Sequence, residues 1–297
     1  QGTDQFGGSL IAVTPWSLTA GTIDLSASAA ASGGQVLMQA GNQGGVSGLV
    51  ANAGNMSFGS ITTAGANGGN VQIISLGAGG TINNPLANIT SNASAVNGLA
   101  GSITVSAPGA ITLGDLSTQA TEALSTSSYG GSILLTSAAL GAAIVTGTIN
   151  TSADDFAGNF FGIVRLGSTV TTGLISQAGA TPGYTFIGTP VGSVVNIVGN
   201  TTLSFGAGGV TGFNPGGFTT INAAAGVLTV NTNGDQRLLV PVTALSGNLT
   251  LASVSTVVTA GAASGYGLFS AGNISAGTMT AVSTGVPGTS VTVSSSY

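Results

Sequence analysis

The sequence contains no histidine, cysteine or lysine among its 297 residues, and its only basic side chains are Arg165 and Arg237. Without His and Cys, the common zinc, haem and iron–sulfur ligand sets are excluded, as are thiol nucleophiles and His-based triads. Without Lys there is no P-loop lysine, no Schiff base and no basic surface for nucleic acid. We therefore expect no enzyme activity, no catalytic or metal-binding residue, no cofactor and no nucleic-acid partner.

Charge of either sign is scarce. Charged residues make up 3% of the chain, against about 25% in an ordinary soluble domain, and the net charge is −5. Hydrophobic residues still reach 42%, which is enough to form a core. No apolar run approaches the ~18 residues of a membrane span, so no transmembrane segment is expected. The first residues lack the basic and apolar regions of a signal peptide, which favours a mature extracellular or cell-surface protein.

Glycine, by contrast, is abundant, with 51 residues. A glycine pair followed by a small polar residue precedes a short β-branched segment at Gly7-Gly8, Gly33-Gly34, Gly68-Gly69 and Gly130-Gly131, and Ala100-Gly101 is a near match. Short apolar segments with flanking glycine are typical of β-strands. The predicted strands after these pairs are Ser9–Thr14, Gln35–Met38, Val71–Leu76, Ser102–Ser106 and Ser132–Thr136.

A second motif, Gly-x-apolar-polar-apolar-x-x-apolar, begins at Gly54, Gly109, Gly247 and Gly272. The change from alternation to a gap of three predicts a bend that keeps the apolar side chains on one face. The rhythm continues more loosely in the second half of the chain, in residues 161–166, 192–198, 217–221, 226–230 and 290–293. Counting all such segments gives roughly ten repeat units, in the length range of solenoid repeats.

Matching strands at a long period favour stacking of strand on equivalent strand, one coil above the next. We therefore predict an all-β fold, a parallel β-solenoid of roughly ten coils in one domain spanning residues 1–297. Its regular repeats cover about 7–150, and more divergent coils cover 151–297. The alternative is a β-sandwich subunit with donor-strand exchange, which would place turns every 8–12 residues.

The repeat from Gly101 through Thr118, followed by a Ser/Thr-rich loop and Gly130-Gly131-Ser132-Ile133, resembles the repeats of large bacterial exoproteins of the filamentous-haemagglutinin type. The resemblance covers residues 7–150 well and the remainder loosely. It implies a right-handed parallel β-helix displayed outside the cell, commonly as an adhesin.

The acidic residues offer little chemistry. Asp154-Asp155 is the only carboxylate pair, and adjacent residues on a strand point to opposite faces, so we interpret the pair as part of a solvated loop. Asp24, Asp115 and Glu122 have no cationic neighbour in the sequence and are interpreted as exposed. Arg165 and Arg237 could each pair with an acid.

Aromatic and asparagine residues leave alternatives open. Trp16, Phe160, Phe161 and Phe213 are equally compatible with a core or an interface, and with aromatics at 5% no carbohydrate-stacking track is expected. Sequons of the form Asn-x-Ser/Thr make a set of candidate glycosylation sites wherever the asparagine faces outward: Asn55, Asn88, Asn92, Asn150, Asn200, Asn248 and Asn273.

The principal functional hypothesis is structural. A stack of coils ends in rows of unpaired backbone groups that invite another chain unless they are capped, and neither end of this sequence has the pattern of a cap. We predict a subunit of an extracellular filament, surface fibre or biofilm matrix that pairs with itself head to tail or by exchange of residues 1–14 or 286–297. The predicted contact residues are Gly8, Leu10, Ile11, Val13, Val291 and Val293.

Two other classes remain as alternatives. The first is a secreted adhesin whose loops bind a cell surface or a matrix carbohydrate. The second is a carbohydrate-active β-helix enzyme, which is disfavoured because the usual acid and base residues are scarce.

Overall fold

The computed structural model describes residues 7–28, 30–42, 51–120, 127–138 and 142–158 with their side chains, and from residue 160 onward mainly the backbone of the strands given below. Within these residues the chain is all-β, and every pairing between named strands is parallel. The chain therefore winds as a parallel β-solenoid, the predicted fold class, and the β-sandwich alternative is wrong.

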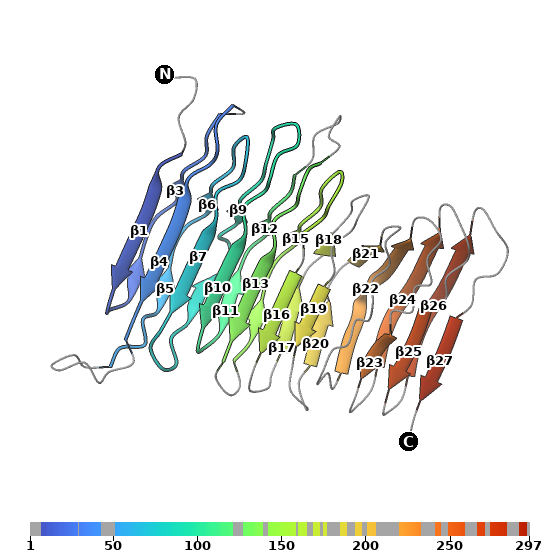
Figure 1. Cartoon of the computed structure of the whole chain (residues 1–297). Coiled ribbons are helices and arrows are strands. Elements are labelled where there is room, and N and C mark those ends of the chain that lie inside the picture. The colour runs from blue at the N-terminus through green and yellow to red at the C-terminus, as the bar shows by residue number, and fades with distance from the viewer. Residues whose placement is uncertain are drawn as a thin grey trace.

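Each regular coil consists of one longer strand followed by two short strands. The longer strands stack side by side as one seven-stranded sheet, coloured from blue to yellow in Figure 1. In stacking order they are β1 (Ser9–Thr14), β4 (Gln35–Ala40), β7 (Val71–Ser75), β10 (Ile103–Ala107), β13 (Ile133–Ser137), β16 (Phe160–Val164) and β19 (Thr185–Gly188). The first five coincide with the predicted strands to within two residues at either end.

The short strands form two lines that belong to a second sheet, of 17 strands. The first line contains β2 (Leu18–Thr19), β5 (Met56–Ser57), β8 (Ile82–Asn84), β11 (Ile111–Leu113), β14 (Ile144–Val145), β17 (Thr169–Thr172) and β20 (Val194–Ile197). The second line contains β3 (Ile23–Asp24), β6 (Ile61–Thr62), β9 (Ile89–Thr90), β12 (Leu116–Ser117), β15 (Ile149–Asn150), β18 (Ile175–Ser176) and β21 (Thr201–Phe205). Glycines such as Gly59 and Gly114 lie at the bend between the two lines, where the second sequence motif predicted a bend.

The glycine pairs are explained by the distance between coils. A Cβ built on the second glycine of a pair would collide with the carbonyl oxygen of the preceding coil's glycine, at 1.8 Å for Gly69 against Gly34 and 1.9 Å for Gly131 against Gly101. Any larger residue would push the two coils apart and break the ladder hydrogen bonds between them. Here glycine is required for close backbone approach.

The core is filled by inward side chains from all three strands of each coil, and the longer strands contribute two or three each. In the second line of short strands, Ile61, Ile89, Leu116 and Ile149 stack in register and are at most 1% exposed. Buried hydroxyls complete each coil. The Oγ1 atoms of Thr63, Thr118 and Thr151 donate to the carbonyls of Gly69, Gly131 and Gly158. These bonds tie the end of the third strand of a coil to the glycine that precedes the next longer strand.

The strand pattern changes after residue 205. β22 (Thr220–Thr232) is one strand of 13 residues that pairs with both β20 and β21. The remaining strands are β24 (Leu249–Val258) and β26 (Ile274–Ser283), which extend the large sheet, and β23 (Pro241–Ala244), β25 (Tyr266–Ser270) and β27 (Val291–Ser295), which form a third sheet.

This change corrects the predicted number of coils. The residues described with their side chains amount to about four turns, fewer than the roughly ten coils predicted for the whole chain. The sequence count took residues 217–221 and 226–230 as two units, although residues of both belong to the single strand β22. Glycine-flanked apolar segments mark bends as well as coil starts, so counting them overestimates the number of turns.

Candidate assembly edge

Strand β1 forms one edge of the seven-stranded sheet, and among the described residues it pairs only with β4. Its outward side chains are unusually apolar and open, with Ile11 70% and Val13 62% exposed. Its inward residue Leu10 is half-buried, whereas the equivalent Val36 in the next coil is 2% exposed. The predicted contact residues of β1 therefore lie at a sheet edge whose core side is only partly covered.

The same incomplete burial extends around the whole first described coil. Its inward residues pack against the core on one side and stay partly exposed on the other: Leu10, Ala12, Leu18, Ala20, Ile23 and Leu25. In the coils above, the residues stacked on Leu18 and Ile23 are Met56 and Ile61, both almost fully buried. Covering this face would remove further apolar surface from water.

Gly8, another predicted contact residue, also differs from its counterparts. A Cβ at Gly8 meets no atom within 4 Å, although Cβ atoms at the equivalent Gly34 and Gly69 would collide with the preceding coil. Gly21, at the bend between β2 and β3, likewise has open space around its Cβ position. At the equivalent bends Gly59 and Gly147 would collide with the coil below.

Val291 and Val293 lie in β27, which is an edge strand of the three-stranded sheet. They are in register with Tyr266 and Leu268 of β25. The sequence thus placed both groups of predicted contact residues on edge strands, although β1 and β27 belong to different sheets.

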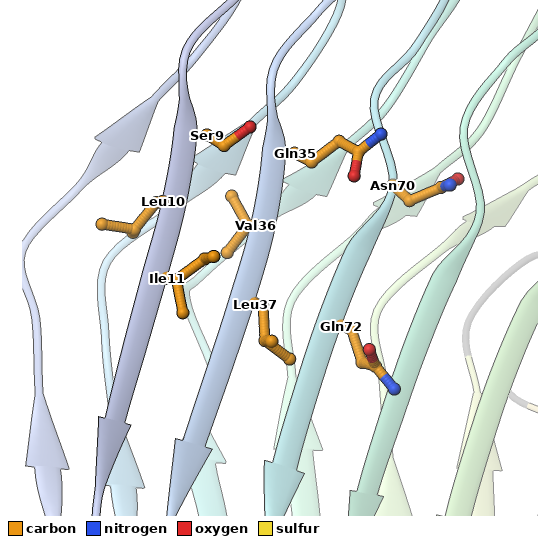
Figure 2. Close-up of a pocket in the computed structure, with 8 residues that line it drawn as sticks. All are labelled: Ser9, Leu10, Ile11, Gln35, Val36, Leu37, Asn70 and Gln72. Carbon is orange, nitrogen blue, oxygen red and sulfur yellow. The ribbon is translucent and has the colours of Figure 1, made fainter.

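A shallow cleft of about 300 Å³ crosses the outer surface of β1, β4 and β7 next to this edge. Figure 2 shows its lining, which combines aliphatic side chains with hydroxyl and amide groups and contains no charge: Ser9, Leu10, Ile11, Gln35, Val36, Leu37, Asn70 and Gln72. The Asn70 carboxamide oxygen accepts a hydrogen bond from the Ser102 backbone N–H at 2.8 Å. The cleft was not foreseen, because its lining residues come from three strands separated by loops.

The predicted acidic residues do not converge. Asp154 and Asp155 lie in a bend, and the backbone N–H of each donates to Ser128 Oγ at 3.1 and 3.2 Å. Asp115 is exposed, and its carboxylate accepts a hydrogen bond from the Thr148 backbone N–H in the next coil. In the described part of the chain, no three His, Cys, Asp or Glu side chains gather where they could hold a metal ion. Glu122, Arg165 and Arg237 lie outside the described residues.

Asp24 is exposed on the edge strand β3. Hydrogen bonds from the Ser26 side chain and backbone N–H lower the pKa of its carboxyl group below the ordinary 3.8. It therefore keeps its negative charge across the neutral and mildly acidic range, at the same edge as β1.

The sequon asparagines have a structural role that the sequence did not reveal. Asn55 and Asn88 are exposed, Asn92 and Asn150 are half-buried, and the side-chain oxygens of the first three accept backbone N–H hydrogen bonds from the next coil. The Asn150 amide donates to Gln119 Oε1 in the preceding coil. Asn200, Asn248 and Asn273 lie outside the described residues. Glycosylation of these positions stays a prediction.

The aromatic residues divide between core and surface. Phe160 is fully buried and Trp16 is 53% exposed, while the Phe161 side chain and Phe213 lie outside the described part. The sequence analysis missed a stack of Tyr129 on Phe156, with ring centroids 4.7 Å apart and planes 8° from parallel. Tyr129 stands two residues before Gly131 and Phe156 two residues before Gly158, and this constant offset was the available signal.

Comparisons with family models, with curated proteins and with solved structures give no match. The resemblance to filamentous-haemagglutinin-type exoproteins therefore stays a prediction from the repeat pattern. None of the described segments is a helix with the length and apolar character needed to cross a membrane.

Proposed function

We propose that this protein is a structural subunit of an extracellular filament or surface fibre that acts by associating with itself. The observation that carries the proposal is the edge at β1, where an uncharged strand with two outward aliphatic side chains borders a core that the described residues cover on one side only. Edge strands of this kind are templates for pairing with another chain.

The surface chemistry supports association. With 3% charged residues, the chain has few like charges to oppose the close approach of two copies. A parallel coil of one copy, stacked on a coil of another, would continue its backbone hydrogen-bond pattern and cover its apolar residues. Each added copy would therefore be stabilised both by hydrogen bonds and by burial of apolar surface. Contacts between two different ends of a molecule propagate into a filament when rotation does not close them into a ring.

The test is negative-stain electron microscopy with sedimentation velocity on the purified chain at rising concentration. Filaments whose subunit repeat equals the length of one solenoid support the proposal, and their number should rise with concentration. A chain that sediments as a monomer at every concentration contradicts it.

The cleft across β1, β4 and β7 favours a second candidate, an adhesin that binds a neutral carbohydrate. The Gln35 and Gln72 side-chain amides make no hydrogen bond within the described residues, and Leu37 lies between Ile11 and Gln72 in the register of the three strands. Amides both donate to and accept from sugar hydroxyls, and a pocket of this size is at the lower limit for a small ligand.

A glycan array tests this candidate. Binding of a neutral oligosaccharide that Gln35→Leu and Gln72→Leu each abolish would support it. Gln39→Leu is the matched control, because Gln39 lies on the same strand as Gln35 but does not line the cleft. Equal loss in all three variants, or no binding by the wild type, contradicts the adhesin candidate.

A further inference from the structure

We propose that Asn97 is a site of spontaneous covalent modification, at which the side chain cyclises onto the Gly98 nitrogen and is then hydrolysed by water to aspartate or isoaspartate. The same dipeptide at Asn67-Gly68 is protected, because its atoms are held by the coils on either side. This inference is independent of the proposed self-association and concerns the chemical lifetime of the chain.

The reaction requires an asparagine followed by a residue whose backbone nitrogen is accessible. Glycine meets this requirement best, because it has no side chain to hinder the attack. The chain contains three Asn-Gly pairs, at Asn67, Asn97 and Asn233, and the last lies outside the described residues. In the reaction the glycine nitrogen loses its proton and bonds to the asparagine Cγ, the Cγ–Nδ2 bond breaks, and ammonia leaves. Water then adds to either carbonyl of the succinimide ring and opens it.

At Asn67-Gly68 both reacting groups are engaged by other coils. The Asn67 carboxamide oxygen accepts a hydrogen bond from the Leu99 backbone N–H at 2.9 Å, and its Nδ2 donates to Ser32 Oγ at 3.3 Å. The Gly68 N–H donates to the Leu99 carbonyl at 2.8 Å. Ser32 belongs to the preceding coil and Leu99 to the following one, so the Gly68 nitrogen is released only when two coils separate.

Asn97-Gly98 lies in a turn that is closed by its own hydrogen bond. The Gly98 N–H donates to the Ala95 carbonyl at 2.8 Å, so this bond joins two residues of the same turn. Asn97 is exposed, and among the residues that the structure describes it is the only non-glycine residue with a positive φ, at 59°. L-residues rarely adopt this left-handed conformation, so leaving it relieves strain. Local opening of the turn therefore releases the Gly98 nitrogen while the coils stay stacked.

The two ends of this turn are anchored to neighbouring coils. Before the turn, the Ser94 backbone N–H and Oγ donate to the Gly65 carbonyl at 2.9 and 3.0 Å. After it, Gly98 is buried, and its carbonyl accepts a hydrogen bond from the Tyr129 N–H at 3.1 Å. Asn97 is exposed between these anchors, so the additional backbone methylene of an isoaspartate is accommodated on the solvent side.

The modification changes the charge of the chain more than its shape. Either product has a carboxylate that is ionised at neutral pH. The product is therefore one unit more negative than the net charge of −5 that the unmodified chain carries. Because charged residues are scarce in this chain, isoelectric focusing separates the product readily from the starting protein.

The experiment compares the folded chain with the chain in urea, both incubated at mildly alkaline pH. Samples are digested with pepsin, because two arginines and no lysine give few tryptic peptides. Mass spectrometry then measures the conversion of amide to acid at each asparagine. In the folded chain we expect Asn97 to react roughly tenfold or more faster than Asn67, since turns open far more readily than stacked coils. In urea the two rates should agree within about threefold, because the contacts between coils are lost.

Asn97→Gln is the matched control, because glutamine keeps the amide but needs a larger ring to react. This variant should lack the first acidic species that the wild-type chain forms on isoelectric focusing, while the rate at Asn67 stays unchanged.

Three other results would overturn the inference. Equal rates at Asn67 and Asn97 in the folded chain would show that the contacts between coils give no protection. An Asn97 that reacts in urea but not in the folded chain would show that the turn does not open. Aspartate without isoaspartate at residue 97 would show direct hydrolysis of the side chain and exclude the ring intermediate.

Discussion

Ile23 and Ile89 hold the same inward position in two coils of the solenoid, yet they have different surroundings. Ile89 stacks between Ile61 and Leu116 and is fully buried. Ile23 contacts Ile61 on one side only and stays partly exposed. The residue types and the local strand are the same, so the difference comes entirely from the number of neighbouring coils. A solenoid coil obtains its stability from its neighbours, as nearest-neighbour models of repeat proteins require.

The largest expected effect follows from placing a side chain between two internal coils. In Gly69→Val, the new Cβ would lie 1.8 Å from the Gly34 carbonyl oxygen, and the backbone on both sides would have to move. Adding atoms to a packed core lowers the free energy of unfolding by about 1–3 kcal/mol when side chains can move aside. The loss should be larger here, because the new side chain collides with backbone atoms. We expect this variant to lose the cooperative unfolding transition in urea, which is measured by circular dichroism. Gly8→Val should keep it, and equal damage from both would show that the edge is not open.

The next largest effect is expected from truncating Ile23 and Ile89, the two isoleucines compared above. Ile89→Ala should destabilise the chain by about 2–5 kcal/mol, because it removes a fully buried side chain and leaves a cavity. Ile23→Ala should cost about half as much, since water already reaches part of that side chain. Urea denaturation of both variants measures the difference. Equal losses would mean that Ile23 is as well covered in solution as Ile89.

The buried hydroxyls give a smaller effect. Thr118→Val keeps the shape of the side chain but removes its hydrogen bond to the Gly131 carbonyl. Loss of a buried hydrogen bond of this kind costs about 1–3 kcal/mol. Thr62→Val is the control, because Thr62 is not fully buried and makes no side-chain hydrogen bond among the described residues, so a change within about 0.5 kcal/mol is expected. If both variants have the same melting temperature, the buried threonine hydroxyls do not stabilise the coils.

The smallest effect concerns the charge at the edge. Because the folded-state pKa of Asp24 is lowered, its hydrogen bonds to Ser26 favour folding at neutral pH, and this contribution disappears as pH falls below 3.8. The carboxylate is fully exposed, so Asp24→Asn should barely change the melting temperature at pH 7. The measurement is the melting temperature of both proteins from pH 7 to pH 2, in which any small advantage of the wild type vanishes at the acidic end. A wild-type advantage that grows in acid contradicts the lowered pKa.

Much of the coil could be predicted from residues alone. The short β-branched segments Ser9–Thr14 and Val71–Leu76 with their flanking glycines indicated strands, and the glycine pairs before them marked where each coil begins. The sequence did not reveal the inter-coil hydrogen bonds of Asn55 and Asn88, because their partners lie 26 and 27 residues away. It also overcounted the coils, since β22 joins two apolar segments that are separate strands in earlier coils.

The sequence predicted strands near both ends of the chain, whereas contact through them stays a prediction. Alternating apolar residues near both ends of the sequence indicated strands able to pair, and both groups lie on edge strands. The cleft beside β1 and the open positions at Gly8 and Gly21 could not be predicted, because each is defined by atoms from other coils.

The sequence by itself determined the type of coil, through its period, its glycine pairs and its lack of charge, since these act within one repeat. Only the tertiary structure decided which glycine pair is pressed against a carbonyl and which faces open space, and which isoleucine is buried. Gly7-Gly8 and Gly68-Gly69 are the same dipeptide. They differ because the burial of a residue in a stack depends on the coil beside it, about 30 residues away in the sequence, and the first described coil has such a neighbour on one side only.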